Sequence, residues 1–212
     1  GTLGVFTEIT LRLVGIEREV SAATCAFREI KDAAKAVAHI VQGGLSPAAL
    51  ELLDADSIRA INAFREMKLE ESHMLFMEFR GNVAEVSENL RMAEDICRSN
   101  GCISFSGAIG RDERDKLWEA RHTIYYACAA MNPGKKVIVT DVAVPISRFP
   151  EMVEIARGVI TRLNLTGPIV AHAGDGNIHA GIFYSDEAEF ERAAQANDEI
   201  VNAAIDMGGT VS

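Results

Sequence analysis

Two histidines that flank a glycine-rich turn are the residues of this sequence best suited to chemistry. They are the first and last residues of the segment His172-Ala-Gly-Asp-Gly-Asn-Ile-His179, which has apolar, strand-forming residues on both sides. The glycines permit a tight turn, so the two imidazoles can converge across it. Neutral imidazole binds zinc, manganese and iron, and two histidines with one carboxylate form an open metal site. Asp175 is the local carboxylate, but the turn can direct it away from the rings, and a plain hairpin with incidental histidines is the alternative.

A second group lies on the stretch LWEARHTIYYA, which covers residues 117–127 and has helical spacing. Arg121 and Tyr125 are four residues apart and Trp118 lies one turn before Arg121, so a continuous helix places them on nearly the same side. A guanidinium beside a phenol hydroxyl suits a small carboxylate, which Arg binds with two parallel hydrogen bonds. The alternative is an exposed arginine that stacks on the aromatic rings of its own helix.

The other histidines and the cysteines indicate structural roles. His122 is expected at the surface or beside the site, whereas His39 and His73 have no neighbours in the sequence that suggest chemistry. The cysteines form no C-x-x-C pair and are too sparse for a disulfide scaffold, so we expect reduced core thiols. They are Cys25, Cys97, Cys102 and Cys128.

The composition bounds the class of protein. The 212 residues are 48% hydrophobic and 25% charged, as in an ordinary globular domain. A formal charge of -10 repels phosphate backbones and anionic membranes, which argues against nucleic acid as a partner. No apolar run is long enough for a membrane span and no targeting signal is visible, so we expect a cytoplasmic or membrane-peripheral protein. A single arginine can still hold an anionic substrate.

Periodicity predicts alternating helices and strands. Apolar residues at helical spacing predict helices, and β-branched or alternating runs predict strands. The expected helices are 27–41, 58–64, 83–98, 114–131, 150–163 and 187–207, the last with a cap at Ser185 or Asp186. The expected strands are 7–13, 19–26, 74–79, 102–105, 137–144, 169–171 and 178–184, and 46–54 is expected to hold a turn and a helix start. This order predicts the α+β class, with helices covering one face of a mainly antiparallel sheet, as in ferredoxin-like folds and their duplications.

Three segments, in their order and spacing, resemble the C-terminal half of FAD-linked oxidases of the vanillyl-alcohol oxidase superfamily. They are DVAVPISRFPEMV, GPIVAHAGDGNIHAGI and LWEARHTIYYA. The resemblance is greatest to the cytochrome-type D-lactate dehydrogenases and glycolate oxidase FAD-binding subunits. It implies that residues 1–18 are a terminal strand segment of an FAD-binding domain missing here. Residues 19–212 are then a substrate-binding cap domain, truncated before its C-terminal end.

The resemblance also implies an activity and roles for individual residues. A D-2-hydroxy acid of D-lactate or glycolate type lies over FAD and loses its C2 hydride to the flavin. His172 and His179 are catalytic and bind a divalent metal, Zn or Mn, whose third ligand is a Glu expected after Ser212, so the site is incomplete in this chain. Arg121 grips the substrate carboxylate as a catalytic and substrate-binding residue. Tyr125 assists it, and Asn177 contacts the cofactor.

The same resemblance sets the expected partners. These are a small 2-hydroxy acid, an electron-acceptor protein or quinone, and a second copy in a homodimer, while this chain without FAD is expected to be inactive. A different reading is a stand-alone ferredoxin-like domain that binds a small anion or regulates without catalysis. A divalent-metal hydrolase is disfavoured, because the sequence shows neither a Ser or Cys nucleophile constellation nor three metal ligands.

Overall fold

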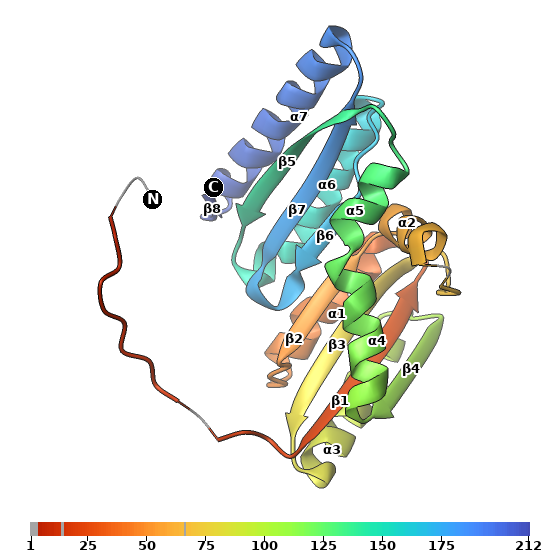
Figure 1. Ribbon diagram of the computed structural model, residues 1–212, viewed down its shortest axis with the longest axis vertical. Coiled ribbons are helices and arrows are strands. Elements are labelled where there is room, and N and C mark those ends of the chain that lie inside the picture. Colours follow the sequence, from red (N-terminus) through yellow and green to blue (C-terminus); the bar gives the residue numbers. More distant parts are fainter. Residues whose placement is uncertain (1–3, 14, 66) are drawn as a thin grey trace.

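The computed structural model describes residues 4–13, 15–65 and 67–212 (Figure 1). Within these residues one sheet of eight strands has the order β4-β1-β3-β2-β6-β7-β5-β8. Every pair of neighbouring strands is antiparallel. Helices cover both faces of the sheet, whereas cover on one face was predicted, because each face has its own cluster of apolar side chains to bury. The predicted α+β class with a mainly antiparallel sheet is confirmed.

The chain forms this sheet from two units of the same topology. The first unit contains β1 (Glu19–Phe27), α1 (Ile30–Gln42), β2 (Ala49–Leu53), α2 (Ala55–Arg65), β3 (His73–Gly81), α3 (Val83–Ser99) and β4 (Ser104–Ile109). The second contains β5 (Lys136–Ala143), α6 (Phe149–Arg162), β6 (Ile169–His172), β7 (Asn177–Tyr184), α7 (Glu187–Asp206) and β8 (Thr210–Val211). Apart from the inserted α2, each unit runs strand-helix-strand-strand-helix-strand, with its fourth strand beside its first and its third between first and second. This is the ferredoxin-like arrangement, present twice.

The two units are joined in two ways. Their second strands, β2 and β6, pair edge to edge, with Leu52 opposite Ala171, and this pairing makes the two sheets continuous. The helices α4 (Arg111–His122) and α5 (Ile124–Ala130) connect β4 to β5 and cross in front of the sheet (Figure 1). A residue at the paired edge therefore lies close to both units and to the connecting helices.

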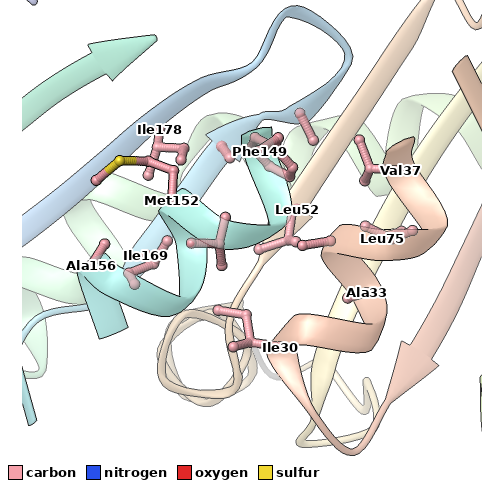
Figure 2. Close-up of a cluster of buried hydrophobic side chains, with 14 of the residues drawn as sticks. Ile30, Ala33, Val37, Leu52, Leu75, Phe149, Met152, Ala156, Ile169 and Ile178 are labelled. Atoms are coloured by element: carbon pink, nitrogen blue, oxygen red, sulfur yellow. The ribbon is translucent and has the colours of Figure 1, made fainter. Parts of the chain in front are cut away.

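The larger core lies on the face covered by α1, α3, α6 and α7. Alternate side chains of each strand point to this face, because successive residues of a strand point to opposite sides. The apolar stripes of α1 and α6 pack against these side chains (Figure 2). The residues labelled there are Ile30, Ala33, Val37, Leu52, Leu75, Phe149, Met152, Ala156, Ile169 and Ile178. Full burial of a side chain such as Phe149 contributes about 2 to 3 kcal/mol.

The opposite face is covered unevenly. The helices α2, α4 and α5 bury a second cluster there, which includes Ile58, Phe76 and Trp118. Over the second unit the cover is thinner, and Val139 of β5 keeps 50% of its surface exposed. The strand ends of the second unit are therefore accessible from this side.

Two sequence predictions about the positions of helices are wrong. Residues 49–53 form the strand β2, where a turn and a helix start were expected, because this short apolar segment pairs with β3 and β6. The single helix predicted over residues 114–131 is two helices, α4 and α5, with a break at Thr123. Its hydroxyl donates to the carbonyl oxygens of Ala120, at 3.0 Å, and Glu119, at 3.3 Å, and such bonds compete with helix continuation.

Other boundaries differ by a few residues. The strand β1 continues through Phe27, so α1 begins at Ile30 and not at residue 27. The strand β4 begins two residues later and ends four residues later than the predicted strand at 102–105. Asp186 caps α7, as predicted, by accepting a hydrogen bond from the Glu189 N–H at 2.8 Å. The four cysteines are free thiols, as predicted.

The N-terminal segment has no strand at residues 7–13, where the alternating pattern predicted one. Residues 4–13 and 15–18 contain no strand in the part that the structure describes, and they extend away from the sheet (Figure 1). A strand needs a neighbouring strand for its backbone hydrogen bonds, and this segment lies beside none. Residues 1–3, also within the predicted terminal segment, lie outside the described residues.

Candidate active site

Four ionisable side chains form a row across neighbouring strands on the α4 and α5 face of the sheet. We call Glu51, His172, His179 and Asp141 the polar row. They belong to β2, β6, β7 and β5, which are adjacent in that order. Glu51 lies opposite His172 in one strand pair, and His179 lies opposite Asp141 in another. The sheet register therefore brings together residues from both units.

The turn between the two histidines depends on one glycine. Residues 173–175 form a single 3-10 turn, and Gly176 closes it with a φ of 73°, a conformation that L side chains rarely adopt. A Cβ at Gly176 would also overlap the carbonyl oxygen of Val144. Asp175 is exposed on this turn. The prediction that the turn brings the two imidazoles together holds, with their ring centroids 5.4 Å apart and nearly perpendicular at 89°.

His172 is held by a carboxylate that the sequence analysis did not select. Its Nδ1 lies 2.7 Å from Oε1 of Glu51. An ionised carboxylate only accepts hydrogen bonds, so Nδ1 of His172 is the donor in this contact, and in the neutral ring that leaves the lone pair on Nε2. This tautomer is the one that binds a metal through Nε2, and a carboxylate on the other nitrogen is a common support for such ligands.

His179 has a similar neighbour. Its Nδ1 lies 3.4 Å from Oδ1 of Asp141. Asp141 is fixed in turn by Ser212, whose hydroxyl donates at 2.7 Å, and by the Asn177 amide, also at 2.7 Å. The hydrogen bond from Ser212 is the main cause that lowers the pKa of Asp141, and Asn177 adds to it. Burial lowers the pKa of His179, so this ring is neutral near pH 7, the form that can bind a metal.

Arg121 is neither exposed nor stacked on its own aromatic residues. Its Nε and Nη2 atoms each lie 2.8 Å from Oε2 of Glu51, and its side chain is 12% exposed. Trp118 instead packs beside Arg114, with 5.9 Å from the guanidinium carbon to the ring centroid. Trp118 is buried in the second apolar cluster with Ile58 and Phe76, so it packs in the core. A signal for Glu51 was present in the sequence, since it is one charged residue within the apolar run ALELL.

A small cavity opens beside this row, between α5 and the strands β5, β6 and β7. Its volume is about 190 Å³. Arg121, Tyr125 and His179 supply its polar groups, and Tyr125 is 55% exposed. The other lining residues are Ile124, Cys128, Val137, Val139, Pro168, Val170, Gly181 and Phe183. A cavity of this size with one cationic end suits a small organic anion.

The described residues contain no group of three or more His, Cys, Asp and Glu side chains arranged to hold a metal ion. His172 and His179 present two imidazoles, each with a carboxylate near Nδ1, and this donor set fits two of the three protein ligands of a catalytic metal site. The site thus suits a divalent cation in part. Asn177, predicted as a cofactor contact, uses its amide nitrogen to hold Asp141 and, at 3.1 Å, the carbonyl of Val142.

Together, the fold and the site define a duplicated ferredoxin-like domain that presents a guanidinium and the imidazole of His179 to a small, mostly apolar cavity, with the second imidazole, His172, beside the first. Residues 16–212 match the family model described as FAD linked oxidases, C-terminal domain. The chain belongs to this family. The family resemblance seen in the three sequence segments is thereby confirmed.

Two curated relatives and one solved structure illustrate the similarity. The chain is 37% identical to the probable mitochondrial D-lactate dehydrogenase of Danio rerio, over 99% of the chain and 43% of that protein. It is 30% identical to the glycolate oxidase subunit GlcD of Bacillus subtilis, over 100% of the chain and 46% of that protein. The chain therefore spans less than half of either relative. Its fold resembles 4-ethylphenol oxidase from Gulosibacter chungangensis, with a TM-score of 0.68 at 13% identity over 95% of this chain and 46% of that one.

Among the described residues, no helix combines the length and the apolar character needed to cross a membrane.

Proposed function

We propose that this chain is the substrate- and metal-binding domain of an FAD-dependent D-2-hydroxy-acid dehydrogenase of D-lactate or glycolate type. The observation that carries the proposal is that Arg121 and His179 line one small cavity, with the ring of His172 5.4 Å from that of His179. The names of the relatives support the substrate class, since one is a probable D-lactate dehydrogenase and the other a glycolate oxidase subunit. The reaction is oxidation of the 2-hydroxyl group to a carbonyl.

Arg121 binds the substrate carboxylate in this proposal. Glu51 occupies the Nε and Nη2 edge of the guanidinium, so the Nη1 end is the part that meets a second anion in the cavity. Burial of Arg121 strengthens such a contact, because fewer water molecules compete for the charge. Tyr125 lines the same cavity and supplies a hydroxyl beside the carboxylate.

His172 and His179 are the residues that would hold a divalent cation, Zn or Mn, at the reacting end of the substrate. When bound, such a cation lowers the pKa of a hydroxyl group that coordinates it, which favours loss of the hydroxyl proton. Glu51 and Asp141 keep the rings oriented and increase their basicity as ligands. The polar row thus places the hydroxyl end near the histidines and the carboxylate end near Arg121.

FAD, when bound, supplies the hydride acceptor for the C2 hydrogen. The thinly covered area around Val139 and Tyr125 lies beside the cavity and is apolar enough for a flat ring system. Asn177 is the first residue of β7, two residues before His179, and is the proposed cofactor contact. We assign residues 19–212 to the substrate-binding domain and residues 1–18 to a strand segment of the FAD-binding domain, in which the exposed Ile9, Leu11 and Leu13 gain sheet partners.

The partners follow from the reaction. Reduced FAD must pass its electrons to an acceptor, and we propose a protein or a quinone, with the enzyme in the cytoplasm or peripheral to a membrane. A homodimer is part of the same proposal.

Anaerobic reduction of the flavin tests the proposal in the FAD-containing protein that carries this chain. D-lactate, glycolate and D-2-hydroxyglutarate are mixed with the oxidised protein, with L-lactate as the control, and the flavin absorbance is followed. We expect rapid bleaching with at least one D-2-hydroxy acid or glycolate, and loss of this bleaching in His172→Ala. Absence of bleaching with all three acids contradicts the proposal. Tight D-lactate binding without flavin reduction favours the anion-binding alternative.

A further inference from the structure

Glu51 contacts both ends of the proposed site with the two oxygens of one carboxylate. Oε1 lies 2.7 Å from Nδ1 of His172, and Oε2 lies 2.8 Å from Nε and from Nη2 of Arg121. We infer that Glu51 is a positioning residue that couples the cation-binding imidazole to the anion-binding guanidinium. This inference rests on the proposed function for what His172 and Arg121 bind, and it adds a role for a residue that touches neither ligand.

The backbone gives Glu51 little freedom to move. It lies in the middle of β2 and pairs with Phe76 of β3 on one side and with His172 of β6 on the other. Its side chain is 9% exposed. A shift of this carboxylate therefore requires a shift of the sheet where the two units join. A positioning group needs this rigidity, because site residues must be held within a fraction of an ångström of their productive geometry.

The coupling follows from the shared carboxylate. Glu51 fixes the Nδ1–H tautomer of His172, and this leaves the Nε2 lone pair available for a cation. The same charge holds the guanidinium of Arg121 by one edge and leaves its other end toward the cavity. When a cation binds Nε2, the Nδ1 proton is drawn more strongly to Glu51. Glu51 therefore orients both the cation-binding imidazole of His172 and the anion-binding guanidinium of Arg121.

Glu78 provides a matched comparison inside the same chain. It is as deeply buried as Glu51 and lies on β3, the neighbouring strand. It accepts hydrogen bonds from Arg114 at 2.7 Å and Arg80 at 2.6 Å. Arg114 and Arg121 are seven residues apart on α4, which is about two helical turns, so both reach down from the same side. The two carboxylates differ in that Glu51 also contacts an imidazole, that of His172.

The first test is the tautomer of His172 in the unsubstituted 212-residue chain. Nitrogen-15 chemical shifts of the ring are measured by NMR, with assignment by His172→Ala. We expect the Nδ1–H form. The Nε2–H form overturns the inference directly. The measurement needs no variant at Glu51, so it does not depend on whether such a variant folds.

The second test uses Zn²⁺ alone as the probe, titrated into the unsubstituted chain, Glu51→Gln and Glu78→Gln. Loss of a carboxylate behind a histidine ligand weakens metal affinity by about 10- to 100-fold. We expect this loss for Glu51→Gln, a change of less than about twofold for Glu78→Gln, and partial recovery in Glu51→Asp. Equal losses in Glu51→Gln and Glu78→Gln show a general structural effect and overturn the inference.

A third measurement separates this inference from the proposed function. If the unsubstituted chain binds no Zn²⁺ while His172 keeps the Nδ1–H form, the metal role fails and the positioning of His172 by Glu51 stands. In the FAD-containing protein, Glu51→Gln should raise KM for the 2-hydroxy acid and lower kcat as well, because both ends of the site lose their support. Glu51→Asp should recover part of both. Unchanged KM and kcat in Glu51→Gln overturn the coupling.

Discussion

The two ferredoxin-like units have the same order of strands but differ in how the second strand connects to the third. In the first unit, residues 54–72 make this connection and include α2. In the second unit, residues 173–176 suffice, and the turn needs Gly176. The long connection places a helix over the face that α4 and α5 also cover, whereas the short turn leaves that face open.

This difference decides what the buried polar groups do. On the third strand of the first unit, the side chain of Glu78 is 2% exposed and binds two arginines of its own chain. In the second unit, the side chains of His172 and His179 are 47% and 31% exposed, and His179 lines the cavity. The covered carboxylate of Glu78 is used for internal ion pairs, whereas the exposed imidazoles of His172 and His179 are available to a ligand. Glu51 lies at the boundary and contacts both kinds of neighbour.

The two arginines of α4 give the sharpest test of this comparison. In the FAD-containing protein, Arg121→Ala should lower kcat/KM for the 2-hydroxy acid by more than about tenfold, because loss of one partner of a desolvated charge pair costs about 2 to 5 kcal/mol. Flavin content should stay normal. Arg114→Ala is the matched control, since it removes a partner of Glu78, and it should change stability but leave kcat/KM within about twofold. Unchanged kinetics in Arg121→Ala remove this residue from the site.

A second test concerns the ion pair that links the two units. Arg157 of α6 pairs with Asp54, which follows β2, is fully buried and also accepts the backbone N–H of Ile169 at 2.8 Å. Removal of Arg157 leaves a buried carboxylate short of its charge partner, so Arg157→Ala should lower the free energy of unfolding by about 3 kcal/mol. The surface control Arg91→Ala should change the free energy of unfolding far less, because its ion pair with Glu88 is exposed to solvent. Urea unfolding measures both, and similar losses contradict a special role for this link.

The short turn can be tested at its two glycines. Gly176→Ala should lower the free energy of unfolding by about 2 to 3 kcal/mol, because the new Cβ meets the Val144 carbonyl and the positive φ is unfavourable for alanine. Gly174→Ala places its Cβ 3.4 Å from the Leu50 side chain, an ordinary contact, and should cost less than about 1 kcal/mol. Thermal or urea unfolding distinguishes the two variants. Equal effects show that the turn does not depend on its left-handed residue.

The smallest expected effect is the pH dependence contributed by Glu78. Burial acts to raise its pKa, but hydrogen bonds from Arg114 and Arg80 outweigh burial, and its pKa lies below the ordinary value. A carboxyl with a lowered folded-state pKa stabilises the fold above its unfolded pKa, about 4.3, and this stabilisation is lost as the pH falls through the folded pKa. The stability difference between the unsubstituted chain and Glu78→Gln should therefore shrink as the pH falls from about 5 to 3. A constant difference contradicts this assignment.

Much of the local structure was predictable from the sequence. The helices at 83–98, 150–163 and 187–207 have strong apolar periodicity and a stop signal, and each is present within a few residues. The β-branched run at 137–144 is likewise a strand. The two histidines could be expected to converge because the glycine-rich turn between them is short, so their separation depends on few intervening residues.

Tertiary structure decided the features that depend on distant segments. The strand β2 forms because β3 and β6 lie beside it, and five residues with an ambiguous pattern do not reveal that pairing. The break at Thr123 was hidden by apolar spacing that continues through it. The order of the strands shows that the ferredoxin-like unit is duplicated, whereas the amino-acid sequence has no obvious repeat. The contact of Glu51 with Arg121 and His172 joins positions 70 and 121 residues apart, so local spacing could not predict it. Periodicity thus determined which residues form helices and strands, and sheet register decided which charges meet, because register depends on long-range pairing.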